Sequence, residues 1–150
     1  MPYVGDLLSG RQPLWLSVQA TALAAAKLMS AAKVKAVLVE EENGHAHALA
    51  GIFTEHDLMT RVVAAGLDPA EVRLAAVLTR DPFTVGRTLR VADARREIQE
   101  RHISHLPVVE QGRVVGMLSL HDVLRADLAE KAHEVAELEG YFLGGTEPVP

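Results

Sequence analysis

Cysteine is absent from the 150 residues of this chain. Its absence excludes a disulfide framework, a thiolate metal site and a cysteine nucleophile. Long apolar runs are absent too, since no stretch approaches the roughly 18 uninterrupted apolar residues of a membrane span. The segment Met1–Asp6 lacks a basic region followed by an apolar run, so we expect a cytoplasmic protein without membrane association.

Clustered positive charge and aromatic residues are also scarce. The chain has 15 Lys and Arg against 20 Asp and Glu, a formal net charge of −5, and only 4% aromatic residues. The basic residues form no stripe and do not alternate with aromatic ones, which argues against nucleic-acid binding. With 49% hydrophobic residues, the chain can form one compact domain or two closely packed halves.

The chain does contain an internal repeat. Gly51–Leu58 (GIFTEHDL) returns as Gly116–Val123 (GMLSLHDV), a shift of 65 residues that keeps the glycine, the hydroxyl, the histidine, the aspartate and the apolar positions. A repeat at nearly half the chain length implies two copies of one structural unit. Two such copies are expected to be pseudo-symmetric and to share a cleft.

Each copy follows the order helix, strand, turn, strand, helix. In the first copy, the alanine-rich segment 20–32 predicts a helix, and the β-branched runs 34–39 and 48–53 predict two strands. Asn43-Gly44 between the strands is a strong hairpin signal. A second helix is expected over about 55–65.

The second copy repeats this order with a shorter hairpin. It predicts a helix over 91–101, strands over 105–109 and 114–118, and a further helix from about Leu120. Aligning the two central strands by their last valine makes the first hairpin five residues longer than the second.

The segments that connect these elements are less regular. A short segment precedes the first helix of each copy, and we call it the lead. The leads include 14–16 and 83–85, which predict short strands that join the same sheets. Pro69 follows an aspartate and suits the first position of a connector helix. The alignment of the two copies used above matches Val39 of the first central strand with Val109 of the second.

Together these features resemble a tandem pair of cystathionine-β-synthase (CBS) domains, also called a Bateman module. The resemblance covers about 4–126 and rests on both Gly-x-x-Thr/Ser-x-x-Asp motifs, the proline-containing strand 105–109 and the lead 77–85. The first copy is the weaker match, because 35–39 lacks the proline and 8–15 lacks the Thr-Val of the second lead.

The resemblance implies an α/β (α+β) fold of two pseudo-symmetric repeats, each a small sheet flanked by helices, packed as one module with two clefts. We expect repeat 1 over 4–66, a connector over 67–75, repeat 2 over 76–126 and a C-terminal helix and tail over 127–150.

The segment 120–139 predicts a long amphipathic helix. Its apolar residues recur at three- and four-residue spacing, at Val123, Leu124, Leu128, Ala132, Val135 and Leu138. Because CBS pairs often associate as disc-like dimers, the resemblance implies a homodimer that this helix would clasp. The alternative is a helix that folds back on its own core.

The resemblance also implies a regulatory, non-enzymatic module that binds AMP, ADP, ATP, NAD or S-adenosylmethionine in its clefts, without a resident cofactor or metal. The motif offers a physical reason, since its glycine allows close approach to the strand and the helix start favours anions. With no effector domain in 150 residues, the output would pass through an unidentified partner protein or through a shift in assembly.

Carried over residue by residue, the resemblance makes Asp57 and Asp122 the acceptors for ribose hydroxyls, with Thr54 and Ser119 beside them. Thr84 is expected at the cleft wall that faces the Asp57 site.

Four further residues are expected to contact phosphates or to respond to pH. Lys35 and His105 lie before the central strands, where the family often has an arginine. Arg125 lies three residues after Asp122, on the same helix face. His121, like its counterpart in the first copy, replaces another frequent arginine, and this predicts a pH-sensitive contact.

The two clefts are expected to be unequal. The cleft of Asp57 has Thr84 and the intact central strand of the second copy. The cleft of Asp122 has Leu14 instead, which cannot hydrogen-bond, but it retains Arg125 where the first copy has a threonine.

Two other interpretations remain open. Both repeated motifs are capping sequences that stabilise a helix start by about 0.5–2 kcal/mol, so the chain could be a ligand-free interaction module. Alternatively, His45 and His47 beside 40–42, which is Glu-Glu-Glu, could hold a divalent metal in an enzyme.

Overall fold

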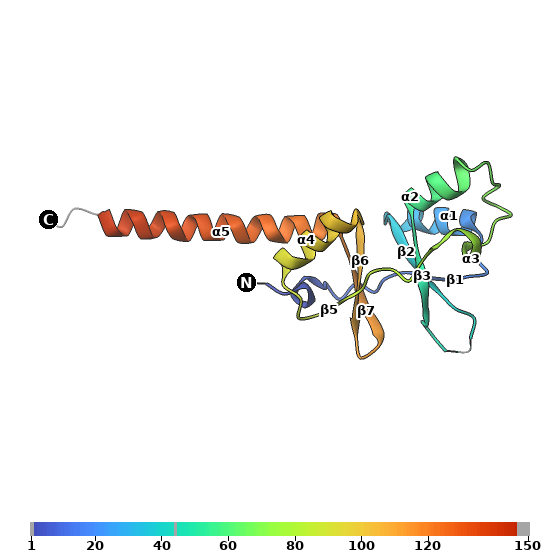
Figure 1. Ribbon diagram of the computed structural model, residues 1–150, viewed down its shortest axis with the longest axis horizontal. Coiled ribbons are helices and arrows are strands. Elements are labelled where there is room, and N and C mark those ends of the chain that lie inside the picture. The colour runs from blue at the N-terminus through green and yellow to red at the C-terminus, as the bar shows by residue number, and fades with distance from the viewer. Residues whose placement is uncertain (1, 44, 147–150) are drawn as a thin grey trace.

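The computed structural model describes residues 2–43 and 45–146 of the chain. Two halves lie side by side, each with a small sheet and its helices, and one long helix projects from the second half (Figure 1). The predicted α/β fold of two sheets flanked by helices is therefore confirmed.

The first half contains β1 (Trp15–Ser17), α1 (Ala22–Ala32), β2 (Ala36–Glu40), β3 (Leu49–Thr54), the single-turn α2 (Glu55–Asp57) and the π-helical segment η2 (Leu58–Val63). Helix α1 begins where Thr21 Oγ1 accepts from the Ala24 N–H at 3.1 Å, and it ends at Lys33, whose φ is 57°. The helix predicted over 55–65 is formed by α2 and η2 together.

Next along the chain come α3 (Leu74–Val77) and β4 (Thr79–Arg80), which belong to the core and the sheet of the first half. The second half contains β5 (Val85–Gly86), α4 (Val91–Arg101), β6 (His105–Glu110), β7 (Arg113–Ser119) and α5 (Leu120–Thr146). Helix α4 has the bounds that the sequence predicts. The predicted leads form β1 and β5, which pair in parallel with the central strands β2 and β6.

The two halves exchange their lead segments. Strand β4 precedes the second half in sequence but pairs antiparallel with β3, so the first sheet has the order β1-β2-β3-β4. Conversely, the N-terminal 3₁₀ helix η1 (Val4–Leu7) packs on the second core, where Val4 is fully buried. Its Val4 N–H donates to the Leu89 carbonyl at 2.8 Å. The exchange ties the halves together and shapes their junction.

The motif glycines make room for these exchanged leads. A Cβ on Gly51 would clash with Leu78 and with the carbonyl of Thr79, and a Cβ on Gly116 would clash with Leu8. Leu78 and Leu8 therefore occupy equivalent places in the two halves. The glycine of each motif is needed because a lead crosses the strand at that point.

The strand register corrects the sequence alignment of the two copies. Val39 lies opposite Gly51, whereas Val108, not Val109, lies opposite Gly116. The hairpin intervals are thus 12 and 8 residues, so the first hairpin is four residues longer, not five. Part of its turn signal, Gly44, lies outside the described residues.

The same register moves His105 relative to the first copy. His105 pairs with Ser119, and Ala36 pairs with Thr54. Lys35 therefore corresponds to Ser104, and the expected equivalence of Lys35 and His105 was wrong by one residue. His105 is a feature of the second half alone.

The connector also differs from the prediction. Pro69 does not open a helix, because residues 69–71 form a turn in which the Asp68 carboxylate accepts from the Ala70 N–H at 2.9 Å. Helix α3 starts only at Leu74. A short Asx-type turn satisfies the local donors, which leaves no reason for a helix there.

Helix α5 does not fold back on its own core. It projects away from the second half (Figure 1), and every residue from Lys131 to Tyr141 is exposed. Leu128, Val135 and Leu138 are each more than half exposed. The alternative of a folded-back helix is therefore wrong for residues 131–141, and the apolar side of the helix is uncovered in the isolated chain.

Candidate functional site

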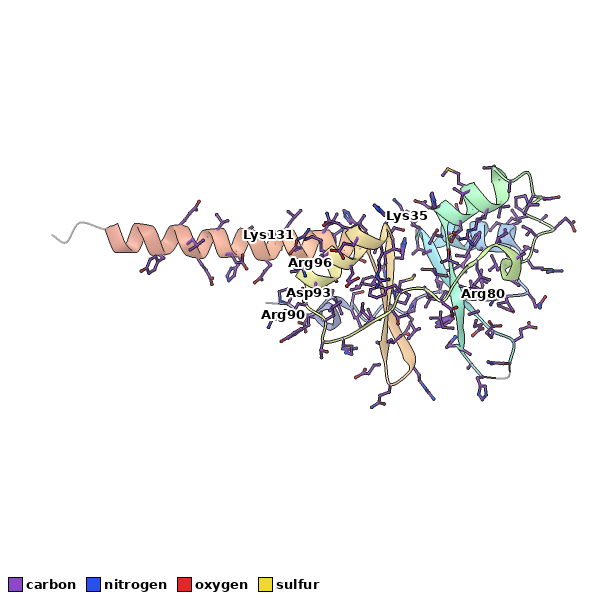
Figure 2. All side chains as sticks on the ribbon, in the orientation of Figure 1. Lys35, Arg80, Arg90, Asp93, Arg96 and Lys131 are labelled. Atoms are coloured by element: carbon purple, nitrogen blue, oxygen red, sulfur yellow. The ribbon has the colours of Figure 1, made fainter. Side chains whose placement is uncertain are left out.

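A cleft of about 2170 Å³ lies at the junction of the two halves. Both repeated motifs open into it, so the two clefts implied by the resemblance are continuous with each other. Figure 2 shows Lys35 at this junction. Eight of the nine residues expected at the site line the cleft: Lys35, Thr54, Asp57, His105, Ser119, His121, Asp122 and Arg125.

Thr84 is the exception, because it is not among the residues that line the cleft. Its neighbours Phe83 and Val85 both pack on the second core. Thr84 is half-buried, and Pro82 and Phe83 from the same segment line the cleft instead.

Each motif forms a capping box. In the first, the Asp57 N–H donates to Thr54 Oγ1 at 3.1 Å and the Thr54 N–H donates to Asp57 Oδ2 at 3.0 Å. In the second, the Asp122 N–H donates to Ser119 Oγ at 3.1 Å and the Ser119 N–H donates to Asp122 Oδ2 at 2.9 Å. The capping interpretation is confirmed for both motifs. The cap uses Oδ2 of each aspartate, so any contact with a ligand depends on whether Oδ1 is available.

In the first motif this second oxygen is occupied. Thr79 Oγ1 donates to Asp57 Oδ1 at 3.1 Å, and Arg61 Nε lies 3.5 Å from the same oxygen. Arg61 is itself held in place, because its guanidinium donates to the Leu78 carbonyl at 2.9 Å. Asp57 is only 5% exposed, so its carboxylate is enclosed by protein groups.

In the second motif the corresponding oxygen is open. Among the side chains described, those of residues 2–43 and 45–141, none forms a hydrogen bond or ion pair with Asp122 Oδ1. Asp122 is half-buried at the cleft. Arg125, three residues later, also lines the cleft, and no described group pairs with it.

The sequence did not identify Thr79 and Arg61 as partners of Asp57. Arg61 lies four residues after Asp57, a spacing at which a helix brings side chains together, and this signal was available. Thr79 reaches Asp57 only because β4 pairs with β3, and a two-residue strand has too little periodicity to be predicted.

His105 lies between the two motifs. It is half-buried, and its Nδ1 lies 3.0 Å from Ser104 Oγ. Burial lowers the pKa of His105 below its ordinary value of 6.5, because the charged imidazolium is poorly solvated there. Glu55 and Asp122 act in the opposite direction and Lys35 adds to the lowering. The site therefore holds a neutral imidazole among charged groups near pH 7.

The cleft lining is richer in cationic side chains than in acidic ones. Its Lys and Arg residues are Arg11, Lys33, Lys35, Arg101 and Arg125, its histidines are His56, His102, His105 and His121, and its acids are Glu55, Asp57, Asp81 and Asp122. The cleft lining thus has five Lys or Arg against four acidic residues, whereas the whole chain carries a net charge of −5, and this local balance is compatible with an anionic group of a ligand.

Of the two histidines considered for a metal site, His45 and His47, the second is held by other contacts. His47 Nδ1 lies 3.0 Å from Glu40 Oε2, and its ring stacks on Trp15 with centroids 4.5 Å apart. Over the described ranges, no three His, Cys, Asp or Glu side chains gather in a way that could hold a metal ion.

The two α/β repeats, which exchange leads and share a cleft at their junction, define this protein as a tandem-repeat module with a site between its repeats. The CBS domain family model matches residues 4–64 and 74–129. The chain therefore belongs to the CBS domain family, as a tandem pair. Among the helices described, none is long and apolar enough to cross a membrane.

Relatives support this assignment. The chain is 31% identical over 134 residues to the mitochondrial CBS domain-containing protein CBSX3 of Arabidopsis thaliana, covering 88% of this chain and 65% of that protein. It is 38% identical over 119 residues to the meiotically up-regulated gene 70 protein of Schizosaccharomyces pombe, covering 79% of this chain and 16% of that protein. It thus spans less than two thirds of either relative.

A solved structure has the same fold. A CBS domain protein from Pyrobaculum aerophilum in complex with AMP superimposes with a TM-score of 0.76 at 28% identity, covering 87% of this chain and 98% of that one.

The lowered pKa of His105 predicts that acid destabilises the fold. In the unfolded chain His105 takes up its proton near pH 6.5, and in the folded chain it does so only at lower pH. The contribution of His105 to stability is therefore complete above pH 6.5 and falls as the pH decreases below it. Melting temperatures measured from about pH 7.5 to about pH 5.5 should fall less for His105→Gln than for the unsubstituted chain.

The control for this measurement is His45→Gln, since His45 lies exposed on the first hairpin. This variant should keep the pH dependence of the unsubstituted chain. Equal pH dependence of His105→Gln and the unsubstituted chain would show that His105 is not the group responsible.

Proposed function

We propose that this chain is a non-enzymatic regulatory module that binds an adenosine-containing ligand in the cleft between its repeats. The observation that carries the proposal is the convergence of both motifs, with their hydroxyls and carboxylates, on one cleft that also contains Arg125. A nucleotide needs both kinds of group, because its ribose offers hydroxyl donors and its phosphate is an anion.

Shape and composition agree with a small-molecule ligand. Ligand sites usually enclose about 300–1,000 Å³, so a cleft of about 2170 Å³ can accommodate a nucleotide. Apolar side chains such as Ile52, Leu14 and Met117 share the lining with the polar groups, which suits a molecule with a flat base and a polar sugar phosphate. The related protein from Pyrobaculum aerophilum was solved with AMP.

We further propose that the module acts as a homodimer. The repeat shift of 65 places Met59 and Val63 of η2 in correspondence with Leu124 and Leu128 of α5. Met59, Val63 and Leu128 are more than half exposed, and uncovered apolar patches of this kind mark interaction surfaces. A second copy related by a twofold axis would cover both patches at once.

Regulation would follow from a difference in ligand contacts between two states of this assembly. A ligand shifts such an equilibrium only by its differential affinity for the two states. The effector protein that receives the signal, like the location in the cytoplasm, remains a prediction from the sequence.

Ligand binding is tested by thermal shift with AMP, ADP, ATP, NAD and S-adenosylmethionine. A ligand at 100 times its Kd adds about 2.7 kcal/mol of stability, which for a chain of this size raises the melting temperature by about 5–10 °C. At least one nucleotide should produce such a shift. If none does at millimolar concentration, the capping role is the whole role of the motifs and the ligand-free interaction module becomes the better description.

The homodimer is tested by size-exclusion chromatography with light scattering. Leu128→Glu or Val63→Glu should convert a dimer to a monomer, because each buries a charge in the proposed interface. His133→Glu adds the same charge on the other side of α5 and should leave the dimer intact. A monomeric unsubstituted chain at micromolar concentration would refute the proposed assembly.

A further inference from the structure

The two halves of the cleft are not equally free to take a ligand. Asp57 and Asp122 are equivalent in the repeat and both cap a helix, but only Asp122 keeps an open carboxylate oxygen. We propose that the ligand-binding half is the one that contains Asp122, and that the half around Asp57 is a closed, structural copy. This inference rests on the proposed function. The sequence predicts that the two clefts differ, and the inference says which of them binds the ligand.

A ligand would have to displace protein groups to reach Asp57. Oδ1 accepts from Thr79 Oγ1 at 3.1 Å and lies 3.5 Å from Arg61 Nε, while Oδ2 accepts from both the N–H and the hydroxyl of Thr54. A ribose hydroxyl could only replace an existing hydrogen bond at this carboxylate. Such an exchange gives little net binding free energy, because the displaced hydroxyl of Thr79 loses its buried partner.

The second half lacks both closing contacts for identifiable reasons. Ser9 is the residue equivalent to Thr79, because Leu8 and Leu78 occupy equivalent positions against the motif glycines. The sheet of the second half has three strands, β5-β6-β7, so within the described ranges no strand carries Ser9 to Asp122 as β4 carries Thr79 to Asp57. The residue equivalent to Arg61 is Ala126, which cannot form an ion pair.

Cationic groups for the anionic end of a ligand are found in the same half. Arg125 lines the cleft, and no hydrogen bond or ion pair to another described residue occupies it. Its counterpart Thr60 is neutral and donates its hydroxyl to the His56 carbonyl at 2.8 Å. His105, a neutral imidazole near pH 7, adds a hydrogen-bonding group to this half, where the first half has Ala36. In the first half the cleft cation Lys35 lies 3.9 Å from Glu55, so an open hydroxyl acceptor and an unpaired cation occur together in the half of Asp122.

The matched pair Asp57→Asn and Asp122→Asn tests this inference, because each variant makes the same chemical change at equivalent positions. Isothermal titration with AMP should give one site per chain for the unsubstituted protein. Asp122→Asn should weaken AMP binding about tenfold or more, as expected for the loss of a charged hydrogen-bond acceptor, and Asp57→Asn should leave the affinity within about twofold. Loss of AMP binding from Asp57→Asn alone, or two equal sites per chain, would overturn the inference.

Melting temperatures of the same variants without ligand give an independent reading. Both variants alter a capping box, but only Asp57→Asn also weakens the contacts with Thr79 and Arg61. Asp57→Asn should therefore lower the melting temperature by about 2–4 °C more than Asp122→Asn. Equal losses would contradict the closed state of Asp57.

The two readings separate this inference from the proposed function. If AMP fails to bind the unsubstituted chain, the proposed function fails for that ligand, and the melting temperatures still decide whether Asp57 is closed. If Asp57→Asn does not fold, Thr79→Val replaces it. Thr79→Val opens Asp57 Oδ1 while it keeps the carboxylate, so AMP should still bind with unchanged affinity at Asp122.

Discussion

Strand β4 pairs with β3 across the boundary between the two repeats, and the organisation of the site depends on this pairing. It places Thr79 opposite Ile52 and brings the Thr79 hydroxyl to the carboxylate of Asp57. The crossing chain also passes over Gly51, which explains the glycine of the motif. On the other half, η1 and Leu8 pack on the core without adding a strand. One local difference in backbone pairing thus makes a duplicated sequence asymmetric.

This asymmetry gives the repeated motif two roles. In both halves the hydroxyl and the aspartate cap a helix, a role that requires one carboxylate oxygen. A ligand can be added only where the other oxygen is free, so the capping and ligand-binding interpretations are compatible at Asp122. In the proposed account, one copy of the motif serves stability and the other serves ligand recognition. Helix α5 starts at the open motif and connects that half to the projecting apolar surface.

Much of this fold could be predicted from the sequence, because local patterns determine it. The alanine-rich segment of α1, the bounds of α4 and the β-branched runs of the central strands each follow from residue periodicity. The strand register, however, is fixed by pairing between strands, so the equivalence of Lys35 with His105 was wrong by one residue. Candidate site residues came from motif position, which identifies Asp122 but cannot show that Thr79 closes the equivalent carboxylate.

A crystal structure of the chain with AMP would test the central claim most directly. The account predicts AMP in the half of Asp122, with a ribose hydroxyl donating to Asp122 Oδ1, the phosphate near Arg125, and the hydrogen bond from Thr79 to Asp57 intact. AMP bound through Asp57, with that hydrogen bond broken and Asp122 free of ligand, would contradict it.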